Sequence, residues 1–385
     1  MFGGMDMKRI LWIVVLLCLL PVRAGAVELD IGGKSALLMD VATGTILYES
    51  NSHEALAPAS VTKVMTMLLI MEAVDSGKIS MADMVTASEA AASKGGSQIY
   101  LKVGETMTVS DMLKSIAVSS ANDCACAMAE HIAGSEAAFV ERMNSRAMEL
   151  GMNDTHFVNC TGLDDGADAA RHRTSAHDIA LMSRELLKNH PDIKKFTTIW
   201  MDTVRNGTFG LSNTNKLVRF YPGATGLKTG FTSGAGYCLS ATAEREGLEL
   251  IAVVMGCTTS QERTAACKGM LDYGFANFAV VNPDLTEHNT AVTVKLGKTP
   301  SISAVLGADT GMLIDKAQKG SITTEIQLAE SVCAPVEKGQ PLGTMTVKAG
   351  DQVLAEVPLV AAEDVARLTW GDLFVKVLKR AAMAR

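Results

Sequence analysis

The chain has 385 residues, of which 48% are apolar, and its formal net charge is −7 at pH 7. A chain of this length and apolar content can bury a substantial core and is long enough for two domains. Its basic residues form no long run, so the charge pattern gives no reason to expect a nucleic-acid partner.

The first 26 residues have the layout of a secretory signal peptide. Lys8 and Arg9 precede an apolar run over residues 10–20, and Pro21 and the small residues 24–26 follow it. This order is typical of a signal peptide cleaved after a small residue, and the run is shorter than the roughly 20 apolar residues that span a bilayer. We therefore expect a mature protein that begins at residue 27 and works outside the cytoplasm, in the periplasmic or cell-wall space.

The first structured elements predicted after the signal are a hairpin and a helix. Residues 36–48 read as two short strands around a turn, and the apolar stretch at residues 61–74 predicts a buried helix. Ser60 and Lys63 stand three residues apart where this helix begins, so both side chains project from the same face. Such a lysine can deprotonate the serine, although chance alone also produces isolated pairs of this kind.

Further helices are predicted in the middle of the chain, over residues 109–119, 122–133, 136–150 and 175–188. Ser120 and Asn122 lie at the break between the first two, where ordinary helix capping is the alternative to a catalytic role. Residues 237–243 and 248–255 read as strands, and Lys228-Thr229-Gly230 precedes them. Helices in the middle with strands from both ends predict an α/β sheet covered by helices.

The composition changes after about residue 278. Four runs alternate apolar and polar residues between Gly and Pro breaks, and they cover residues 291–296, 323–328, 343–347 and 353–360. This pattern predicts a small all-β domain, and no chemical motif falls within it.

The last segment predicts an amphipathic helix with basic flanks. Its apolar residues recur at helical spacing and basic residues lie among them, namely Trp370, Leu373, Phe374, Val377, Leu378 and Ala381 with Lys376, Lys379, Arg380 and Arg385. The residues alone fit a helix packed on the protein as well as a helix that lies on a membrane.

The cysteines and the metal-ligand motifs give no reason to expect a disulfide scaffold or a catalytic metal. Removal of Cys18 with the signal leaves seven cysteines, an odd number that argues against a disulfide scaffold. We expect most of them to be small buried hydrophobic residues. The chain has no HExxH string and no paired CxxC motif, so we expect no catalytic metal and no cofactor.

Three strings in one order resemble the signature of the penicillin-binding proteins and serine β-lactamases: Ser60-Val61-Thr62-Lys63, Ser120-Ala121-Asn122 and Lys228-Thr229-Gly230. Their surroundings are similar to those in the low-molecular-weight D-alanyl-D-alanine carboxypeptidases, which are serine peptidases of the S11 type. The strings that carry this likeness include Pro58-Ala59-Ser60, Ser119-Ser120-Ala121-Asn122-Asp123, Thr155-His156-Phe157-Val158-Asn159 and Gly226-Leu227-Lys228-Thr229-Gly230-Phe231-Thr232. The likeness extends from about residue 27 to residue 278.

The resemblance implies an α/β catalytic domain, with an antiparallel sheet covered by helices, followed by a small all-β domain and a C-terminal amphipathic helix. The expected boundaries are a signal peptide at 1–26, the catalytic domain at 27–280, the β domain at 281–362 and a membrane-anchoring helix at 363–385. This helix would hold the protein on the outer face of the cytoplasmic membrane.

The resemblance also implies roles for individual residues. Ser60 is the expected nucleophile and Lys63 the general base. Lys228 is the expected neighbouring cation that lowers the pKa of Lys63. Ser120 would relay a proton, and Asn122 would contact the substrate. The expected substrate-binding residues are Thr229, Gly230, Phe231, Thr232 and Arg263. The backbone N–H groups of Ser60 and Phe231 would form the oxyanion hole. Phe231 replaces the histidine or tyrosine common in relatives, and Arg173 replaces an aromatic residue.

The activity implied is removal of the terminal D-alanine from peptidoglycan stem pentapeptides through an acyl-enzyme on Ser60, which limits wall cross-linking. β-Lactam antibiotics would acylate the same serine. Two alternatives stay open. A class A-like β-lactamase would need a glutamate for deacylation, and no ExxLN string occurs between Asn122 and Lys228. A peptidoglycan-binding protein without catalytic activity is the other alternative, and the intact triplets disfavour it.

Overall fold

The structure is a computed structural model that describes residues 29, 31–286, 288–307 and 311–375. The predicted signal peptide and residues 376–385 of the predicted terminal helix lie outside these ranges.

The catalytic part is built on one five-stranded antiparallel sheet with the strand order β2-β1-β9-β8-β7. The strands are β1 (Ser35–Asp40), β2 (Ile46–Ser50), β7 (Ala224–Thr232), β8 (Gly236–Arg245) and β9 (Leu248–Cys257). β1 pairs with β9 from Ser35 opposite Met255 to Asp40 opposite Leu250. Strands from the two ends of this part therefore meet in one sheet, as the sequence predicts, and β7 forms an edge.

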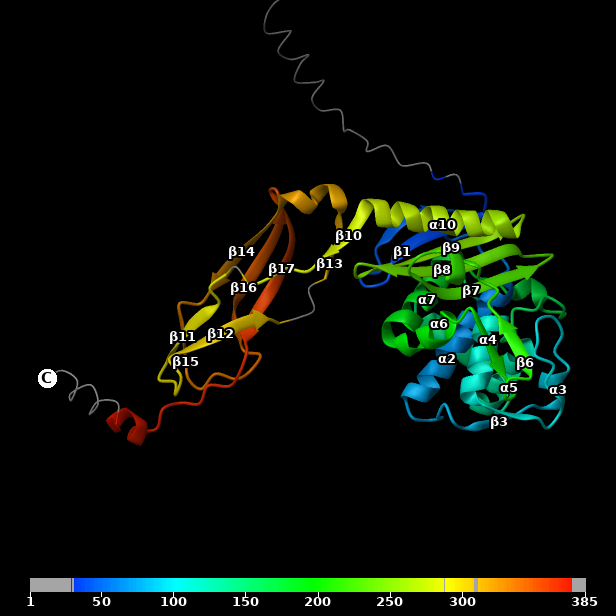
Figure 1. The fold of residues 1–385 in the computed structure, drawn as a ribbon, viewed down its shortest axis with the longest axis horizontal. Helices are drawn as coiled ribbons and strands as arrows, with labels where there is room; N and C mark the ends of the chain where they lie inside the picture. Colours follow the sequence, from blue (N-terminus) through cyan, green and yellow to red (C-terminus); the bar gives the residue numbers. More distant parts are fainter. Residues whose placement is uncertain (1–28, 30, 287, 308–310, 376–385) are drawn as a thin grey trace, which may run out of the picture. The chain divides into compact units, whose positions relative to one another are not determined.

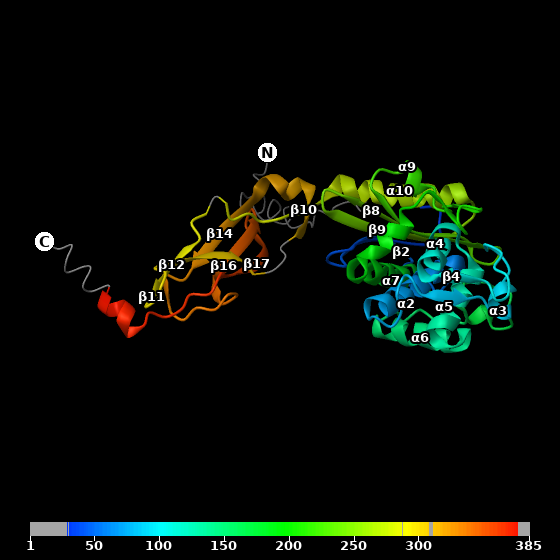
Figure 2. The same cartoon turned by 60° about the horizontal axis from the view of Figure 1, so that its bottom comes forward.

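Helices cover both faces of this sheet (Figure 1). α10 (Ser260–Asn277) lies along one face, and the other helices gather on the opposite face. They are α2 (Lys63–Asp75), α4 (Val109–Ser119), α5 (Asn122–Ala133), α6 (Glu136–Glu149) and α7 (Ala176–Asn189). Figure 2 shows α2, α5 and α6 packed near one another, where buried residues such as Met65, Met128 and Phe139 share the main hydrophobic core. The prediction of an antiparallel sheet covered by helices is confirmed.

Short elements complete this part. The 3-10 turns are η1 (Ala59–Thr62), η2 (Ala169–Arg171) and η3 (Pro191–Ile193), and the short helices are α3 (Glu89–Ala92), α8 (Lys194–Thr197) and α9 (Leu217–Phe220). Two small antiparallel pairs join β3 (Met84–Thr86) to β4 (Thr106–Thr108) and β5 (Met201–Val204) to β6 (Phe209–Ser212). The seven cysteines of the described ranges are all free thiols, and six of them are buried, with only Cys333 exposed. The six buried cysteines therefore pack as small residues in the interior.

The C-terminal part is a six-stranded sheet with the order β14-β16-β17-β12-β11-β15. Its strands are β11 (Ala291–Lys295), β12 (Ser301–Leu306), β14 (Ile322–Leu328), β15 (Ser331–Cys333), β16 (Pro341–Ala349) and β17 (Gln352–Ala361). β10 (Phe278–Val281) pairs with β13 (Met312–Asp315), and the turn η4 (Lys316–Ser321) follows β13. Met345, Val347 and Leu359 belong to a core separate from that of the catalytic part. The prediction of a small all-β domain is confirmed.

The beginning of the predicted terminal helix lies within the described residues. Residues 370–375 are helical. The Thr369 hydroxyl accepts a hydrogen bond from Asp372 N, and the Asp372 carboxylate accepts one from Thr369 N. This reciprocal pair is a capping box that fixes where the helix starts. Among the described residues, none of the helices combines the length and apolar character needed to cross a membrane.

Candidate active site

Ser60 lies on the η1 turn that leads into α2, so it precedes the α-helix instead of lying within it. The preceding residue, Ala59, has a φ of +48°, in the left-handed region that residues with a Cβ rarely adopt. Gly162 lies directly against it, because a Cβ on Gly162 would approach Ala59 O to 1.8 Å. The backbone before the nucleophile candidate is therefore held in an unusual conformation by close packing.

A buried hydrogen-bond chain supports the same turn. Thr62 Oγ1 donates to Ala59 O at 2.8 Å and lies 2.7 Å from His172 Nε2. Val158 N donates to His172 Nδ1 at 3.1 Å, so the proton of the neutral ring is on Nε2 and is donated to Thr62. Burial, with weaker repulsion from His156 and Lys63, lowers the pKa of His172 to about 4. His172 is therefore neutral and fixed in one tautomer at ordinary pH.

Lys63 begins α2 and its side chain is completely buried. Its Nζ donates to Ser60 Oγ at 2.9 Å and to Thr161 O at 2.7 Å. Burial lowers the pKa of Lys63 to about 7, although the nearby Cys160 and Asp123 oppose the shift. A lysine with this pKa is neutral part of the time near pH 7, so it can accept a proton from the serine.

Ser120 and Asn122 lie where α4 ends and α5 begins. Ser120 follows α4 in a left-handed conformation with a φ of +63°, and its buried Oγ has no hydrogen-bond partner among the described residues. Asn122 Nδ2 donates to Gly95 O at 2.7 Å, whereas its buried Oδ1 is also without a partner there. Buried polar atoms are usually paired, so these two oxygens are candidates for contacts with a substrate. Lys63 Nζ donates to Ser60 and Thr161 instead, so Asn122 and Lys63 share no hydrogen bond.

The third triplet lies on the edge strand β7. Lys228 is buried and donates to Thr229 O at 2.9 Å. Burial, together with repulsion by Lys63 and Arg263, holds the pKa of Lys228 well below its usual value. At Lys63 itself burial is the leading cause of the shift. A Cβ on Gly230 would lie 2.7 Å from Pro58 O and 3.1 Å from Ser60 N, so β7 runs directly beside the η1 turn.

Three more of the predicted substrate residues lie on β7 itself. The hydroxyls of Thr229 and Thr214 share a hydrogen bond of 2.6 Å, and Thr232 Oγ1 accepts one from Ala235 N at 3.1 Å. Phe231 is 53% exposed, and its ring stacks on that of Tyr237 at 4.2 Å between centroids.

Arg263 comes from α10 and is buried behind the strand. Its Nη1 donates to Gly230 O at 3.2 Å and to Cys238 O at 3.5 Å, whereas its Nε has no partner among the described residues. The observed contacts of Arg263 are therefore with the strand backbone.

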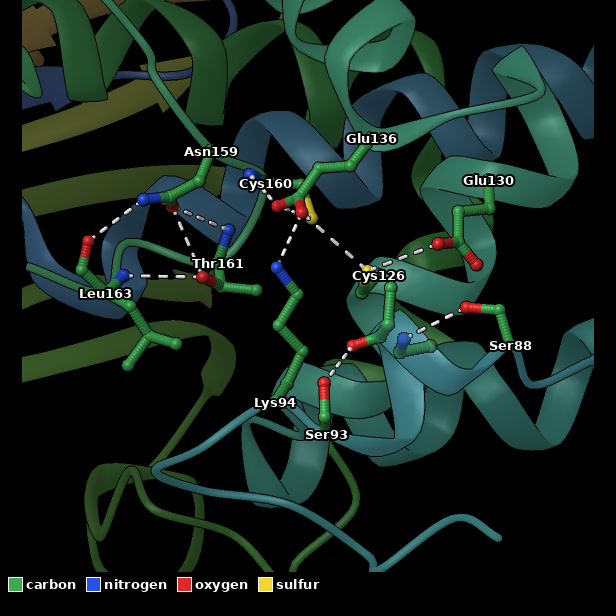
Figure 3. A network of polar contacts seen from close by, with 12 residues as sticks. Ser88, Ser93, Lys94, Cys126, Glu130, Glu136, Asn159, Cys160, Thr161 and Leu163 are labelled. Atoms are coloured by element: carbon green, nitrogen blue, oxygen red, sulfur yellow. Dashed lines mark hydrogen bonds and ion pairs between the residues drawn. The ribbon is translucent and has the colours of Figure 1, made fainter. Parts of the chain in front are cut away.

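Sequence reasoning missed the residues that support Lys63. The acceptor Thr161 O is a backbone atom, so no side-chain motif signals it. Asn159 Oδ1 accepts hydrogen bonds from Thr161 N at 3.1 Å and Gly162 N at 2.6 Å, as Figure 3 shows for Thr161. An asparagine followed by a glycine three residues later was the available hint of a tight turn here.

Glu72, Glu185 and His190 form a cluster whose ligand atoms are close enough to share a metal ion. However, Arg146 donates to Glu72 at 2.7 Å and to Glu185 at 2.6 Å. Its guanidinium already neutralises the two carboxylates, so the donor set is a poor fit for a divalent cation.

Comparisons with known proteins agree with the three motifs. The peptidase S11 family model, described as D-alanyl-D-alanine carboxypeptidase, matches residues 22–259, and the model of the penicillin-binding protein 5 C-terminal domain matches residues 282–367. D-alanyl-D-alanine carboxypeptidase DacF of Bacillus subtilis (strain 168) is 46% identical over 359 residues, which is 92% of this chain and 90% of DacF.

Solved structures are also similar. Penicillin-binding protein 5 of Haemophilus influenzae has 30% identity and a TM-score of 0.71, covering 89% of this chain and 100% of that one. Penicillin-binding protein D2 of Listeria monocytogenes in its ampicillin-bound form has 32% identity and a TM-score of 0.59, covering 64% and 99%. The chain belongs to the peptidase S11 family of serine D-alanyl-D-alanine carboxypeptidases.

Proposed function

We propose that this enzyme cleaves the bond between the two terminal D-alanines of a peptidoglycan stem pentapeptide, with Ser60 as the nucleophile. The observation that carries the proposal is the contact of 2.9 Å between the buried Lys63 Nζ and the half-buried Ser60 Oγ, in which burial lowers the lysine pKa to about 7. A serine becomes a useful nucleophile when an adjacent base can take its proton.

The reaction runs in two halves. In the first, Lys63 takes the Ser60 proton, Oγ bonds to the carbonyl carbon, and the C–N bond to the terminal D-alanine breaks. The leaving amine receives a proton through Ser120, whose buried Oγ has no hydrogen-bond partner in the described ranges. The proton delivered to the amine is the one that Lys63 took, so Lys63 is neutral again. In the second half, water adds to the acyl carbon, the ester bond to Ser60 Oγ breaks, and the proton of the water passes to Oγ, which frees the shortened peptide as a carboxylic acid.

The oxyanion formed in each half is stabilised by the backbone N–H groups of Ser60 and Phe231. The approach of Gly230 to Ser60 N supports this assignment, because it sets the edge of β7 beside the nucleophile's own backbone. Loss of one such donor typically costs roughly 3 to 4 kcal/mol of transition-state stabilisation.

The substrate lies along β7 in this proposal. Thr229 binds the terminal carboxylate, with Lys228 and the guanidinium of Arg263 behind it, and Asn122 Oδ1 accepts a substrate N–H. Gly230 leaves room for the chain, while Phe231 and Thr232 contact the stem peptide farther along the strand. A penicillin binds in the same way and acylates Ser60, as the ampicillin-bound structure of the Listeria relative makes reasonable.

The proposed cellular location rests on the residue patterns of the first and last segments. Residues 1–26 direct export, and residues 27–280 form the catalytic domain outside the cytoplasm. Residues 281–362 act as a pedestal, and residues 363–385 attach the protein to the outer face of the cytoplasmic membrane. Trimming of stem peptides there limits wall cross-linking.

The test is D-alanine release from a pentapeptide ending in D-Ala-D-Ala. We expect release by the mature chain and by Ser76→Ala, a control at the exposed far end of α2. Release should be lost in Ser60→Ala, and mass spectrometry should find penicillin bound to Ser60 in the wild type. Continued release by Ser60→Ala would reject the nucleophile. Fast penicillin turnover without D-alanine release would favour the β-lactamase alternative.

A further inference from the structure

The segment that supplies the Thr161 carbonyl is anchored by contacts on both sides. Cys160 N and Cys160 Sγ each donate to Glu136 Oε1 at 3.2 Å, and Cys160 O accepts a hydrogen bond from Thr66 Oγ1 at 2.7 Å (Figure 3 shows the Glu136 side). Thr161 O then accepts from Lys63 Nζ at 2.7 Å. Two consecutive residues, Cys160 and Thr161, therefore connect Glu136 to the candidate general base.

Glu136 is itself held by a cation. Lys94 Nζ donates to Glu136 Oε2 at 2.6 Å, and both side chains are mostly buried, with 24% and 22% exposed. Burial raises the pKa of Glu136, but the hydrogen bond and charge of Lys94 outweigh it and bring the pKa below its usual value. Glu136 therefore remains a carboxylate and a strong acceptor for Cys160.

We propose that Glu136 is a positioning residue that holds the Cys160–Thr161 peptide so that the Thr161 carbonyl keeps Lys63 Nζ within reach of Ser60. This inference rests on the proposed function, in which Lys63 is the base. A lysine side chain has several rotatable bonds, and two acceptors at its end fix Nζ in one place. Without the Thr161 contact, Nζ samples positions from which it cannot take the Ser60 proton.

A purely structural role for Glu136 is the competing explanation, because it lies in the first turn of α6, where a carboxylate stabilises the helix. That role would change stability alone. The proposed role also changes the titration of Lys63, because a carbonyl that accepts from the ammonium favours the charged form. The other charged or titratable groups facing Lys63 are Cys160, Asp123, Lys228 and His172, and the variants below leave all of them in place.

The experiment measures the second-order rate of Ser60 acylation by a fluorescent penicillin as a function of pH. For Glu136→Ala we expect a plateau about tenfold lower, since a buried N–H loses its acceptor, and a midpoint shifted to lower pH. Glu136→Gln retains an oxygen that can accept from Cys160 N, so it should recover most of the rate and the wild-type midpoint.

Glu130→Ala is the matched control. Glu130 also faces a buried thiol, at 3.9 Å from Cys126 Sγ, but its carboxylate makes no hydrogen bond with residues 159–163 (Figure 3). Its pH profile should match the wild type. Should Glu136→Ala not fold, Thr66→Val removes the other anchor of Cys160 while keeping the side-chain volume, and it should shift the profile in the same direction.

A readout that does not need catalysis separates this inference from the proposed function. Lysine labelled with ¹³C at Cε reports the titration of Lys63 by NMR, and its midpoint should fall in Glu136→Ala. A folded Glu136→Ala protein with the wild-type midpoint would overturn the inference, as would equal effects of Glu136→Ala and Glu130→Ala. Absence of acylation in the wild type would count against the proposed function, while the NMR titration would still decide the role of Glu136.

Discussion

At the scale of single residues, the site combines a strained backbone with a buried base. Ala59 has a positive φ directly before Ser60, and the buried pair of Thr62 and His172 ties its carbonyl down. Strain of this kind persists only where the surroundings enforce it, and it is found at functional sites. The buried lysine beside it is ordered before any substrate arrives, so no reorganisation is needed at the reacting atoms.

The pKa of Lys63 predicts a pH dependence. Below about pH 7 the lysine is protonated and cannot take the Ser60 proton, so the acylation rate should rise about tenfold per pH unit and level off above pH 7. Stopped-flow acylation by penicillin at each pH checks this, with circular dichroism to show that the protein stays folded. A rate that is flat or falls as the pH passes through 7 would contradict Lys63 as the base.

Gly230 offers a test of the fit between β7 and the η1 turn. In Gly230→Ala the new methyl group would meet the fixed backbone atoms Pro58 O and Ser60 N, so Ser60 must shift. We expect at least a tenfold loss of acylation, the order of effect seen when an oxyanion donor is displaced. Gly210→Ala, also in a strand but with no atom within 4 Å of the new Cβ, is the control and should keep the wild-type rate. Equal rates for the two variants would count against this packing.

The sequence predicts the side chains of the site better than it predicts the contacts that hold them in place. The spacing of Ser60 and Lys63 is readable because helical geometry puts residues three apart on one face, and here the 3-10 turn keeps them together. Thr161 contributes a backbone carbonyl, which any residue possesses, and Glu136 reaches Cys160 only through tertiary packing. No periodicity or propensity encodes such contacts.

At the scale of elements, α4 was predictable from its sequence whereas α10 was not, although Thr259 caps α10 by accepting a hydrogen bond from Glu262 N. α4 begins after Thr108, whose hydroxyl accepts from Asp111 N, and it ends at Ser120, so its sequence bounds match the structure. The buried face of α10 instead includes Arg263, Cys267 and Gly274 among its apolar residues. A stripe this mixed in size and polarity gives no clear amphipathic signal, although the spacing of the buried residues is helical.

Gly274 explains part of that composition and gives a prediction for α10. A Cβ at this position would lie 2.5 Å from Leu250 Cδ1 and 3.1 Å from Leu38 Cδ2, both in the sheet, so the glycine permits close helix packing. Gly274→Ala should therefore lower the free energy of unfolding by about 1 to 3 kcal/mol through overpacking.

Gly269→Ala is the matched control in the same helix, because no atom lies within 4 Å of its new Cβ. There the higher helix propensity of alanine should raise the free energy of unfolding by about 1 kcal/mol. Urea denaturation of both variants measures the two changes. Stabilisation by both substitutions would show that α10 is not in close contact with the sheet at Gly274.

At the scale of the whole molecule, the catalytic and C-terminal parts have separate hydrophobic cores. The β domain encloses its own buried residues, and β11, β12, β14, β15, β16 and β17 pair with one another in one sheet. This division explains why the composition changes near residue 278, where the helical pattern gives way to alternation. The proposed chemistry uses residues of the first part alone, so the second part is free to serve attachment.

Membrane attachment is the prediction that belongs to this scale. Trp370 and Phe374 are 89% and 67% exposed on the helical segment that follows the β domain, where burial in a lipid interface would remove them from water. The residues that follow in the sequence add Lys376, Lys379 and Arg380. Each basic residue near an anionic membrane contributes roughly 1 kcal/mol, and salt screens that contribution.

The mature chain, residues 27–385, should therefore sediment with vesicles that contain anionic lipid, more weakly with neutral vesicles, and less as salt is added. A chain ending at residue 368, which keeps Val365 in the β-domain core and removes only the helix, should stay in the supernatant. It should still release D-alanine from a soluble pentapeptide at the full rate, because the proposed site residues all lie before residue 264. Equal sedimentation of the two chains would place membrane binding outside the terminal helix. Binding that salt does not weaken would mean that the apolar face alone holds the protein, and that the basic residues serve another purpose.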